Sequence, residues 1–234
     1  MSWDKMAYHG TEIERGRKAI EKQRLPISVS KEKKEQWLGD GIYLFKDSVY
    51  AYWWINCMHQ KNIEKGKYSN EKELYDKFTI LKVKYECTPE RIFDSEISDH
   101  YIIFNKMKDY CEEKDKKRHK EGEIFNILFN EFELAEQFDV VRWCYSGNTR
   151  MIDEARLRRL PQVQICIKKP NIIQKIEEIE ETEKEKAKGN FGVLFERNDY
   201  NGKYGTKMVG NKRKTRWNLS LIHISEPTRH AQIS

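Results

Sequence analysis

The sequence predicts a mixed fold of the α+β class, in which strands and helices both contribute to the core. Residues 78–87 and 162–168 alternate β-branched or aromatic side chains with polar ones, as half-buried strands do. Residues 124–138 instead repeat apolar side chains at helical spacing. With 38% hydrophobic residues, a chain of 234 residues can bury the core of one ordinary domain with an appendage, or of two small domains.

The positive charge of the chain is concentrated near its C-terminus. The formal net charge is +6, and residues 203–216 hold six Lys or Arg and no acidic residue, so the rest of the chain sums to zero. The basic balance therefore describes a tail and argues against a domain with a broad basic face. Because aromatic residues are scattered through this tail, a nucleic-acid-binding module that contacts phosphates is one alternative function.

The cysteines do not follow a disulfide or metal-binding pattern. There are five, at irregular spacing, without a C-x-x-C pair or a Cys/His cluster of zinc spacing. We therefore expect reduced thiols in an intracellular protein. The sequence has no apolar leader and no run of roughly eighteen apolar residues, so we expect a cytoplasmic protein that does not enter a membrane.

The first predicted elements are a short strand and a helix. Residues 6–11, M-A-Y-H-G-T, are largely apolar, and Thr11 is suited to cap a helix over residues 12–23. Pro26 ends this helix, and the polar residues 28–36 are expected to form a loop.

The rest of the chain is organised around residues 37–54, W-L-G-D-G-I-Y-L-F-K-D-S-V-Y-A-Y-W-W. Gly39 and Gly41 indicate a tight backbone turn that another group can approach closely. A short buried strand over residues 42–45 follows, and then a helix capped by Asp47 or the serine after it. The many aromatic side chains have two interpretations: rings that pack inward at a strand-turn-helix corner, or a stacking wall for a planar ligand.

The remaining segments predict further strands and helices. Residues 92–93 and 140–144 predict short strands, and a helix capped by Asp94 or Ser95 is expected to extend to about residue 110. Residues 177–188 predict a highly charged helix with too few apolar residues to anchor it. We therefore expect this helix to stand off the domain.

Composition divides the chain into three parts. Residues 1–175 form the predicted domain, and residues 176–218 the charged helix and basic tail. Residues 219–229, L-S-L-I-H-I-S-E-P-T-R, resemble a translated transposon adapter from sequencing-library preparation. We therefore expect residues 219–234 to be non-native and the native sequence to stop near Asn218, which leaves room for a missing native C-terminal segment.

Three separate strand ends carry the candidate chemistry. His9 stands in H-G-T, Tyr43 in G-D-G-I-Y-L-F, and Gln164 in V-Q-I-C-I. Singly, each has an ordinary explanation as a turn, core or edge residue. No P-loop, Ser-His-Asp order or pair of catalytic carboxylates competes with them in the sequence.

Together these motifs resemble the NAD-binding core of ADP-ribosyltransferases of the diphtheria-toxin and poly(ADP-ribose) polymerase class. In that family the first motif is His-Gly-Ser/Thr, and the second is Gly-x-Gly-Ile-Tyr-Phe followed by a helix with another stacking aromatic. The third is a Glu that opens a late strand. The resemblance spans residues 6–173, and bacterial toxin-like and phage-defence members are similar in W-L-G-D-G-I-Y. It implies a split antiparallel β-sheet core: two small sheets packed at an angle around an NAD cleft, with helices outside.

The resemblance also implies a role for each matching residue. His9 would hydrogen-bond a ribose hydroxyl of NAD, the backbone of Gly10 would bind the nicotinamide carboxamide, and Tyr43 would stack on the nicotinamide ring. A second ring would come from the following helix, where spacing does not decide among three aromatic residues and Trp53 is favoured. The residues thus assigned to NAD binding are His9, Gly10, Thr11, Gly41, Tyr43, Tyr52, Trp53 and Trp54.

The implied reaction is departure of nicotinamide from C1 of the ribose, while positive charge builds on an oxocarbenium-like centre. A carboxylate would stabilise that charge, but the matching position here is Gln164, whose amide can orient the ribose 2′-hydroxyl without supplying charge. Gln162, two residues earlier on the same strand face, is a fallback for this role. Arg142 and Arg150 are candidates for binding the pyrophosphate.

The preferred function is therefore an NAD-dependent mono-ADP-ribosyltransferase with His9, Tyr43 and Gln164 as catalytic residues. NAD is the donor substrate, and the acceptor is an unidentified protein or nucleic acid. Absence of the carboxylate weakens the case for polymer elongation. The alternatives are slow glycohydrolase activity, a catalytically inactive NAD fold, and the nucleic-acid-binding module.

Overall fold

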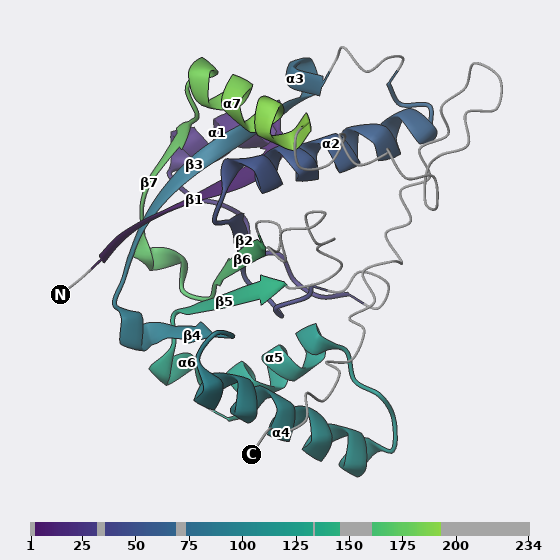
Figure 1. Cartoon of the computed structure of the whole chain (residues 1–234), viewed down its shortest axis with the longest axis vertical. Coiled ribbons are helices and arrows are strands. Elements are labelled where there is room, and N and C mark those ends of the chain that lie inside the picture. Colours follow the sequence, from purple (N-terminus) through teal and green to yellow (C-terminus); the bar gives the residue numbers. More distant parts are fainter. Residues whose placement is uncertain (1–2, 32–35, 69–73, 133, 146–160, 193–234) are drawn as a thin grey trace, which may run out of the picture.

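The structure is a computed structural model that describes residues 3–31, 36–68, 74–132, 134–145 and 161–192 (Figure 1). The strands are β1 (Trp3–Glu12), β2 (Ile42–Phe45), β3 (Phe78–Cys87), β4 (Ile92–Asp94), β5 (Val140–Tyr145), β6 (Gln162–Ile167) and β7 (Ile173–Glu178). The helices are α1 (Ile13–Lys22), α2 (Ser48–Glu64), α3 (Leu74–Lys77), α4 (Ser98–Asp115), α5 (Glu121–Asn130), α6 (Leu134–Gln137) and α7 (Glu181–Phe191), with short 3₁₀ turns η2 (Pro89–Arg91) and η3 (Pro170–Ile172). The predicted mixture of helices and strands is confirmed.

The described strands form one open seven-stranded sheet in the order β4-β5-β6-β2-β1-β3-β7. Among them β4 and β5 pair in parallel, and the other neighbouring pairs are antiparallel. We expected two separate small sheets. Instead, β1 and β2 connect the two halves through one residue pair, Tyr8 opposite Phe45, whereas β1 and β3 pair along ten residues. The half formed by β4, β5, β6 and β2 is therefore joined to the half formed by β1, β3 and β7 by this one residue pair.

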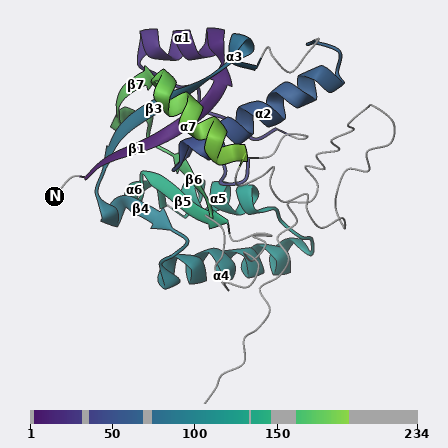
Figure 2. The same ribbon diagram turned by 45° about the horizontal axis from the view of Figure 1, so that its top comes forward.

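Helices cover both faces of the sheet. Because successive strand residues point to opposite faces, Leu81 packs against α1 with Ala7 and Ala19, whereas its neighbour Ile80 packs on the other face. On that second face α2 and α7 lie side by side at one end, and α4 and α5 lie at the opposite end (Figure 1). Figure 2 shows the same separation, with β5 and β6 between the two groups of helices.

The first two elements follow the predicted order with shifted boundaries. Strand β1 extends to Glu12 because all ten of its residues pair with β3. Thr11 therefore lies within the strand, where it is buried, and does not cap α1. The N-cap position is Glu12, and its side chain makes no capping hydrogen bond.

The C-terminal end of the described chain differs from the expectation. Residues 173–178 form β7 at the edge of the sheet, and the following helix does not stand off the domain. Helix α7 packs against α2 and buries Ala187 and Phe191 completely or nearly so. Its Glu183 accepts a hydrogen bond from the Tyr8 hydroxyl at 3.0 Å and pairs with Lys82 at 3.2 Å.

Some expectations fall outside the described residues. Residues 203–216, residues 219–234 and Arg150 lie there. All five cysteines are described and are free thiols. No helix in the described ranges combines the length and the apolar character needed to cross a membrane.

Candidate functional site

The sheet places the three predicted site residues on neighbouring strands. His9 lies on β1, Tyr43 on β2 and Gln164 on β6, and these strands are adjacent in the order β6-β2-β1. Phe45 is the common neighbour, because it pairs with Tyr8 on one side and with Gln164 on the other. Residues far apart in the sequence are thus brought within a few strand widths.

One row of side chains crosses the sheet at this point. Tyr8, Phe45, Gln164 and Trp143 are directly opposite one another on successive strands, and such residues share a face. Tyr8 and Phe45 belong to the apolar cluster beneath α2, whereas Trp143 packs against the cluster beneath α4 and α5. Gln164 is therefore the polar member of the row, at the boundary between the two groups of helices.

The backbone edges of β1 and β2 face each other without pairing beyond Tyr8. Lys46 N–H donates to Val163 of β6, so by strand alternation Phe45 and Tyr43 turn their peptide groups toward β1. Gly10 likewise turns its N–H and C=O toward β2. Gly10 and Tyr43 nevertheless form no ladder pair, because the two strands separate there. We call this place the strand gap.

The imidazole of His9 bridges the strand gap. Its Nδ1 lies 2.8 Å from the carbonyl oxygen of Tyr43. A carbonyl only accepts, so Nδ1 carries the proton and Nε2 of the neutral ring is an acceptor. Burial lowers the pKa of His9, and the hydrogen bond to Tyr43 opposes this only in part. Among the described residues Nε2 has no hydrogen-bond partner.

The ring of Tyr43 is fixed through its hydroxyl group. The hydroxyl donates to the carbonyl of Gly39 at 2.7 Å and accepts from the N–H of Leu38 at 2.8 Å. Burial raises the pKa of Tyr43, so the phenol stays neutral. Gly39 has φ of +70°, a conformation in which glycine is favoured. The glycine turn therefore determines where this ring lies.

Helix α2 packs directly on Gly10. A Cβ atom at this position would lie 2.6 Å from Cγ2 of Ile55 and 2.7 Å from the carbonyl oxygen of Ala51. It would also lie 3.4 Å from Cδ1 of Trp54, so this half-exposed ring is beside the strand gap. Trp53 contacts Phe45, with ring centroids 6.4 Å apart.

The third candidate ring points elsewhere. Tyr52 is buried against Tyr75 and Phe191, with ring centroids 6.0 and 5.1 Å away. It joins α2 to α3 and α7 and is not brought to the strand gap. Of the three candidates, Trp53 and Trp54 lie next to the predicted site, and Tyr50 of α2 also stacks on Phe45, with ring centroids 6.4 Å apart.

Gln164 has an unpaired polar atom inside the protein. Its side chain is 6% exposed, and Oε1 is fully buried without a hydrogen-bond partner in the described structure. The Nε2 atom of Gln162, on the same face of β6, is likewise buried and unpaired. A buried amide oxygen without a partner is destabilising by about 1–3 kcal/mol, so it calls for a ligand or solvent donor.

Thr11 and Gly41 have packing roles that explain their identity. Thr11 is buried beneath α1, where a Cβ on Gly16 would lie 3.4 Å from its methyl group. At Gly41 a Cβ would lie 2.8 Å from the carbonyl oxygen of Ile167, in addition to a clash with Cys166. Packing therefore accounts for both residues without an NAD-binding role.

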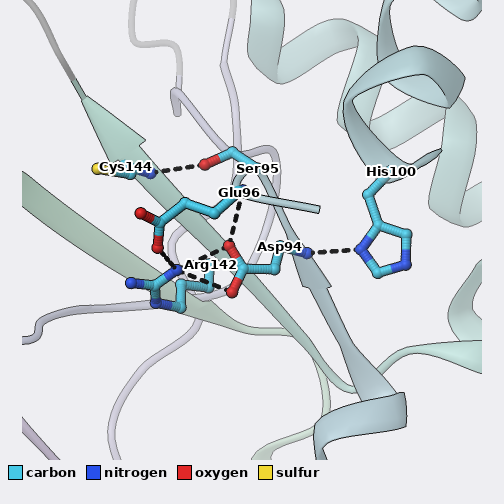
Figure 3. Close-up of polar contacts among 6 residues, drawn as sticks. All are labelled: Asp94, Ser95, Glu96, His100, Arg142 and Cys144. Carbon is cyan, nitrogen blue, oxygen red and sulfur yellow. Dashed lines mark hydrogen bonds and ion pairs between the residues drawn. The ribbon is translucent and has the colours of Figure 1, made fainter. Parts of the chain in front are cut away.

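Arg142 was a candidate for binding the pyrophosphate, but its guanidinium is already paired with carboxylates. Its Nη1 lies 2.7 and 2.8 Å from the two carboxylate oxygens of Asp94 and also contacts Glu96 (Figure 3). Two negative groups around one guanidinium give a local excess of negative charge, which opposes phosphate binding. The cluster instead fastens the segment after β4 to β5, where Ser95 Oγ also accepts from the N–H of Cys144.

Sequence analysis missed two residues that surround the glycine turn. Lys168, just after β6, donates to the carbonyls of Leu38 and Asp40, and Asn126 of α5 hydrogen-bonds Asp40. Nothing in the local sequence marks either residue, since their partners are 86 to 130 residues away. The described residues contain no group of three or more His, Cys, Asp or Glu side chains that could hold a metal ion.

Comparison with known proteins gives one relative and no function. An uncharacterized protein of Methanocaldococcus jannaschii is 27% identical over 201 residues, which cover 76% of this chain and 88% of the relative. No model of a protein family matches the chain. No solved structure matches it either.

Proposed function

We propose that this chain is an NAD-dependent mono-ADP-ribosyltransferase, built on an ADP-ribosyltransferase-like core around the strand gap. The observation that carries the proposal is the placement of His9, Tyr43 and Gln164 on the adjacent strands β1, β2 and β6, with a buried unpaired oxygen on Gln164. The likeness of the sequence motifs to that family supports the same function. The acceptor is an unidentified protein or nucleic acid.

The groups at the strand gap have the chemistry that nicotinamide ribose requires. A carboxamide offers both a donor and an acceptor, which match the C=O and N–H that Gly10 turns toward β2. The Nε2 acceptor of neutral His9 suits a ribose hydroxyl. The held ring of Tyr43, with Trp53 or Trp54 of α2, provides aromatic surface, and stacking contributes roughly 0.5–1.5 kcal/mol beyond burial.

In the reaction, the bond between C1 of the ribose and the pyridine nitrogen breaks. Its electron pair goes to nicotinamide, which leaves as a neutral molecule, and the acceptor's nucleophile then bonds to C1 and loses its proton. Gln164 is suited to accept from the ribose 2′-hydroxyl and hold the sugar in place. Because its amide adds no negative charge, we expect slower turnover than with a carboxylate.

The test is release of free nicotinamide from NAD by the purified protein, measured by liquid chromatography with and without a lysate as the acceptor source. We expect time-dependent release that falls on the order of 10²-fold in His9→Ala and in Tyr43→Ala, because both residues orient the dinucleotide. Tyr110→Ala is the matched control. This tyrosine is 51% exposed on α4, and its removal should leave the rate unchanged.

Three outcomes distinguish the alternatives. Release by the intact protein that survives in His9→Ala and Tyr43→Ala would contradict the assigned site. Binding of NAD, measured by calorimetry, without any release would support a catalytically inactive NAD fold. Neither binding nor release would refute the proposal, and salt-dependent retention on an oligonucleotide would then favour the nucleic-acid-binding module.

A further inference from the structure

The turn formed by Leu38, Gly39 and Asp40 is held from several sides. Tyr43 contacts its first two residues through the hydroxyl group. Asp40 donates its N–H to Asn126 at 2.7 Å, and its carboxylate accepts from the side chain of Asn126 at 3.1 Å and from the N–H of Ser30 at 2.9 Å. Three separate segments therefore meet at one short turn.

Lys168 supplies the cation of this network. Its Nζ donates to the carbonyl oxygen of Leu38 at 2.6 Å and to that of Asp40 at 2.8 Å, and it lies 4.9 Å from the ring centroid of Phe129. Both carbonyls thus point at the same ammonium group. Without it, the Leu38 carbonyl would lose this charged donor, and the Asp40 carbonyl would keep the weak donor Cys166, whose Sγ lies 3.8 Å away.

The carbonyl of Gly39 lies between the two that Lys168 holds, and it is the acceptor for the Tyr43 hydroxyl. A movement of the turn therefore moves the attachment point of the aromatic ring. Asn126 of α5 also limits such movement, because its side chain accepts from the N–H of Asp40 and donates to the Asp40 carboxylate.

We propose that Lys168 is a positioning residue for Tyr43: its ammonium group fixes the turn at residues 38–40, and the turn fixes the ring of Tyr43, whose backbone borders the strand gap. Lys168 itself does not contact the substrate. The inference deepens the proposed function and rests on it for its catalytic consequence. The tether between Lys168, the turn and Tyr43 is a property of the protein alone and is tested separately.

The first test is hydrogen–deuterium exchange, which needs no NAD. In Lys168→Met, which keeps a similar length without the ammonium group, the amides of Leu38 and Asp40 should exchange on the order of tenfold faster. Lys169→Met is the matched control, because this neighbouring lysine pairs with Asp139 at 3.0 Å and does not touch the turn. Unchanged exchange at both amides in Lys168→Met would overturn the inference.

The second test asks whether Lys168 acts through the Tyr43 hydroxyl. We expect Lys168→Met to lower kcat/KM for nicotinamide release about tenfold in the wild-type background and to change it less than about twofold in Tyr43→Phe, where the link is already cut. An equal loss in both backgrounds would overturn the positioning role, because a general structural defect would act on either. Unfolding midpoints measured alongside identify such a defect.

The two proposals fail in different ways. If the wild-type protein neither binds NAD nor releases nicotinamide, the proposed function fails, and exchange then decides the tether alone. In that case Lys168→Met and Tyr43→Phe should each speed exchange of the Leu38 amide, and their combination should add little further. If the two substitutions instead multiply each other's effect on the exchange rate of the Leu38 amide, Lys168 and Tyr43 do not act through the same turn.

Discussion

Gly10→Ala tests whether the close packing of α2 on β1 defines the candidate site. The added Cβ would meet Cγ2 of Ile55 at 2.6 Å and the carbonyl oxygen of Ala51 at 2.7 Å. Ordinary contacts between carbon atoms begin near 3.5 Å, so α2 must move away from the sheet by about 0.9 Å. The side chain of Ile55 can rotate, but the carbonyl of Ala51 belongs to the helix backbone and cannot yield alone.

The expected loss of stability follows from two opposing effects. Overpacking of a fitted core costs about 1–3 kcal/mol. Replacing a strand glycine by alanine returns about 0.5–1 kcal/mol, because the unfolded chain loses conformational freedom. The free energy of unfolding should therefore fall by about 1–2 kcal/mol. Since α2 carries Trp53 and Trp54, a shift of this size should also lower nicotinamide release on the order of 10²-fold.

Urea unfolding followed by tryptophan fluorescence measures the stability change, and Gly189→Ala provides the matched control. Gly189 lies in α7, where an added methyl group would meet no atom within 4 Å. There the same substitution should raise the free energy of unfolding by about 0.5–1 kcal/mol, because alanine favours a helix over glycine. A Gly10→Ala protein as stable as the wild type, or more stable, would refute the packing argument.

Two further predictions concern ion pairs. Asp139 is 6% exposed and accepts from Arg91 at 2.7 Å, and this hydrogen bond holds the pKa of its carboxyl below the ordinary value of 3.8. The stabilising contribution of the ionised carboxylate is therefore full above pH 3.8 and is lost as the pH falls through the lower pKa of the folded state. Asp139→Asn should lower the free energy of unfolding at pH 7 by about 1–3 kcal/mol, and below pH 4 that free energy should depend less on pH than in the wild type. An unchanged dependence of stability on acid pH would contradict this prediction. Glu183→Gln should weaken the ion pair between α7 and Lys82 and lower the free energy of unfolding, measured in urea, by about 0.5–1 kcal/mol. The control is Glu185→Gln, at an exposed position of the same helix, which should leave the free energy of unfolding unchanged.

The elements that the sequence predicts well are those with a clear local pattern. Strand β3 has its predicted bounds because apolar and charged side chains alternate along it. Strand β7, I-Q-K-I-E-E, has only Ile176 buried, so it shows no such pattern. It is held by pairing with β3 and by a distant side chain. Gln23, at the end of α1, accepts from the N–H of Ile176 at 2.8 Å and donates to its carbonyl at 2.9 Å. A contact between residues 153 apart leaves no trace in local sequence.

In the candidate site, too, the residues in local motifs were predicted from the sequence, whereas their distant partners were not. The H-G-T and G-x-G-I-Y motifs indicate His9 and Tyr43 through their resemblance to the motifs of ADP-ribosyltransferases. The partners of these motifs were not predictable. Neither the carboxylates around Arg142 nor the turn contacts of Lys168 follow from the residues beside them. Side-chain hydrogen bonds depend on the sheet order, and that order is set by pairing between distant strands.

The identity of residue 164 is constrained by its surroundings as well as by chemistry. Gln164 lies between the apolar cluster beneath α2 and the one beneath α4 and α5, at 6% exposure. A carboxylate at this position would lose most of its hydration, so its pKa would rise and the free protein would favour the neutral acid. An amide avoids that effect and keeps an oxygen that accepts from a hydroxyl. Substitution by glutamate would therefore add negative charge mainly when a cationic ligand such as the pyridinium of NAD lies beside it, which ties the ionisation of that residue to ligand binding.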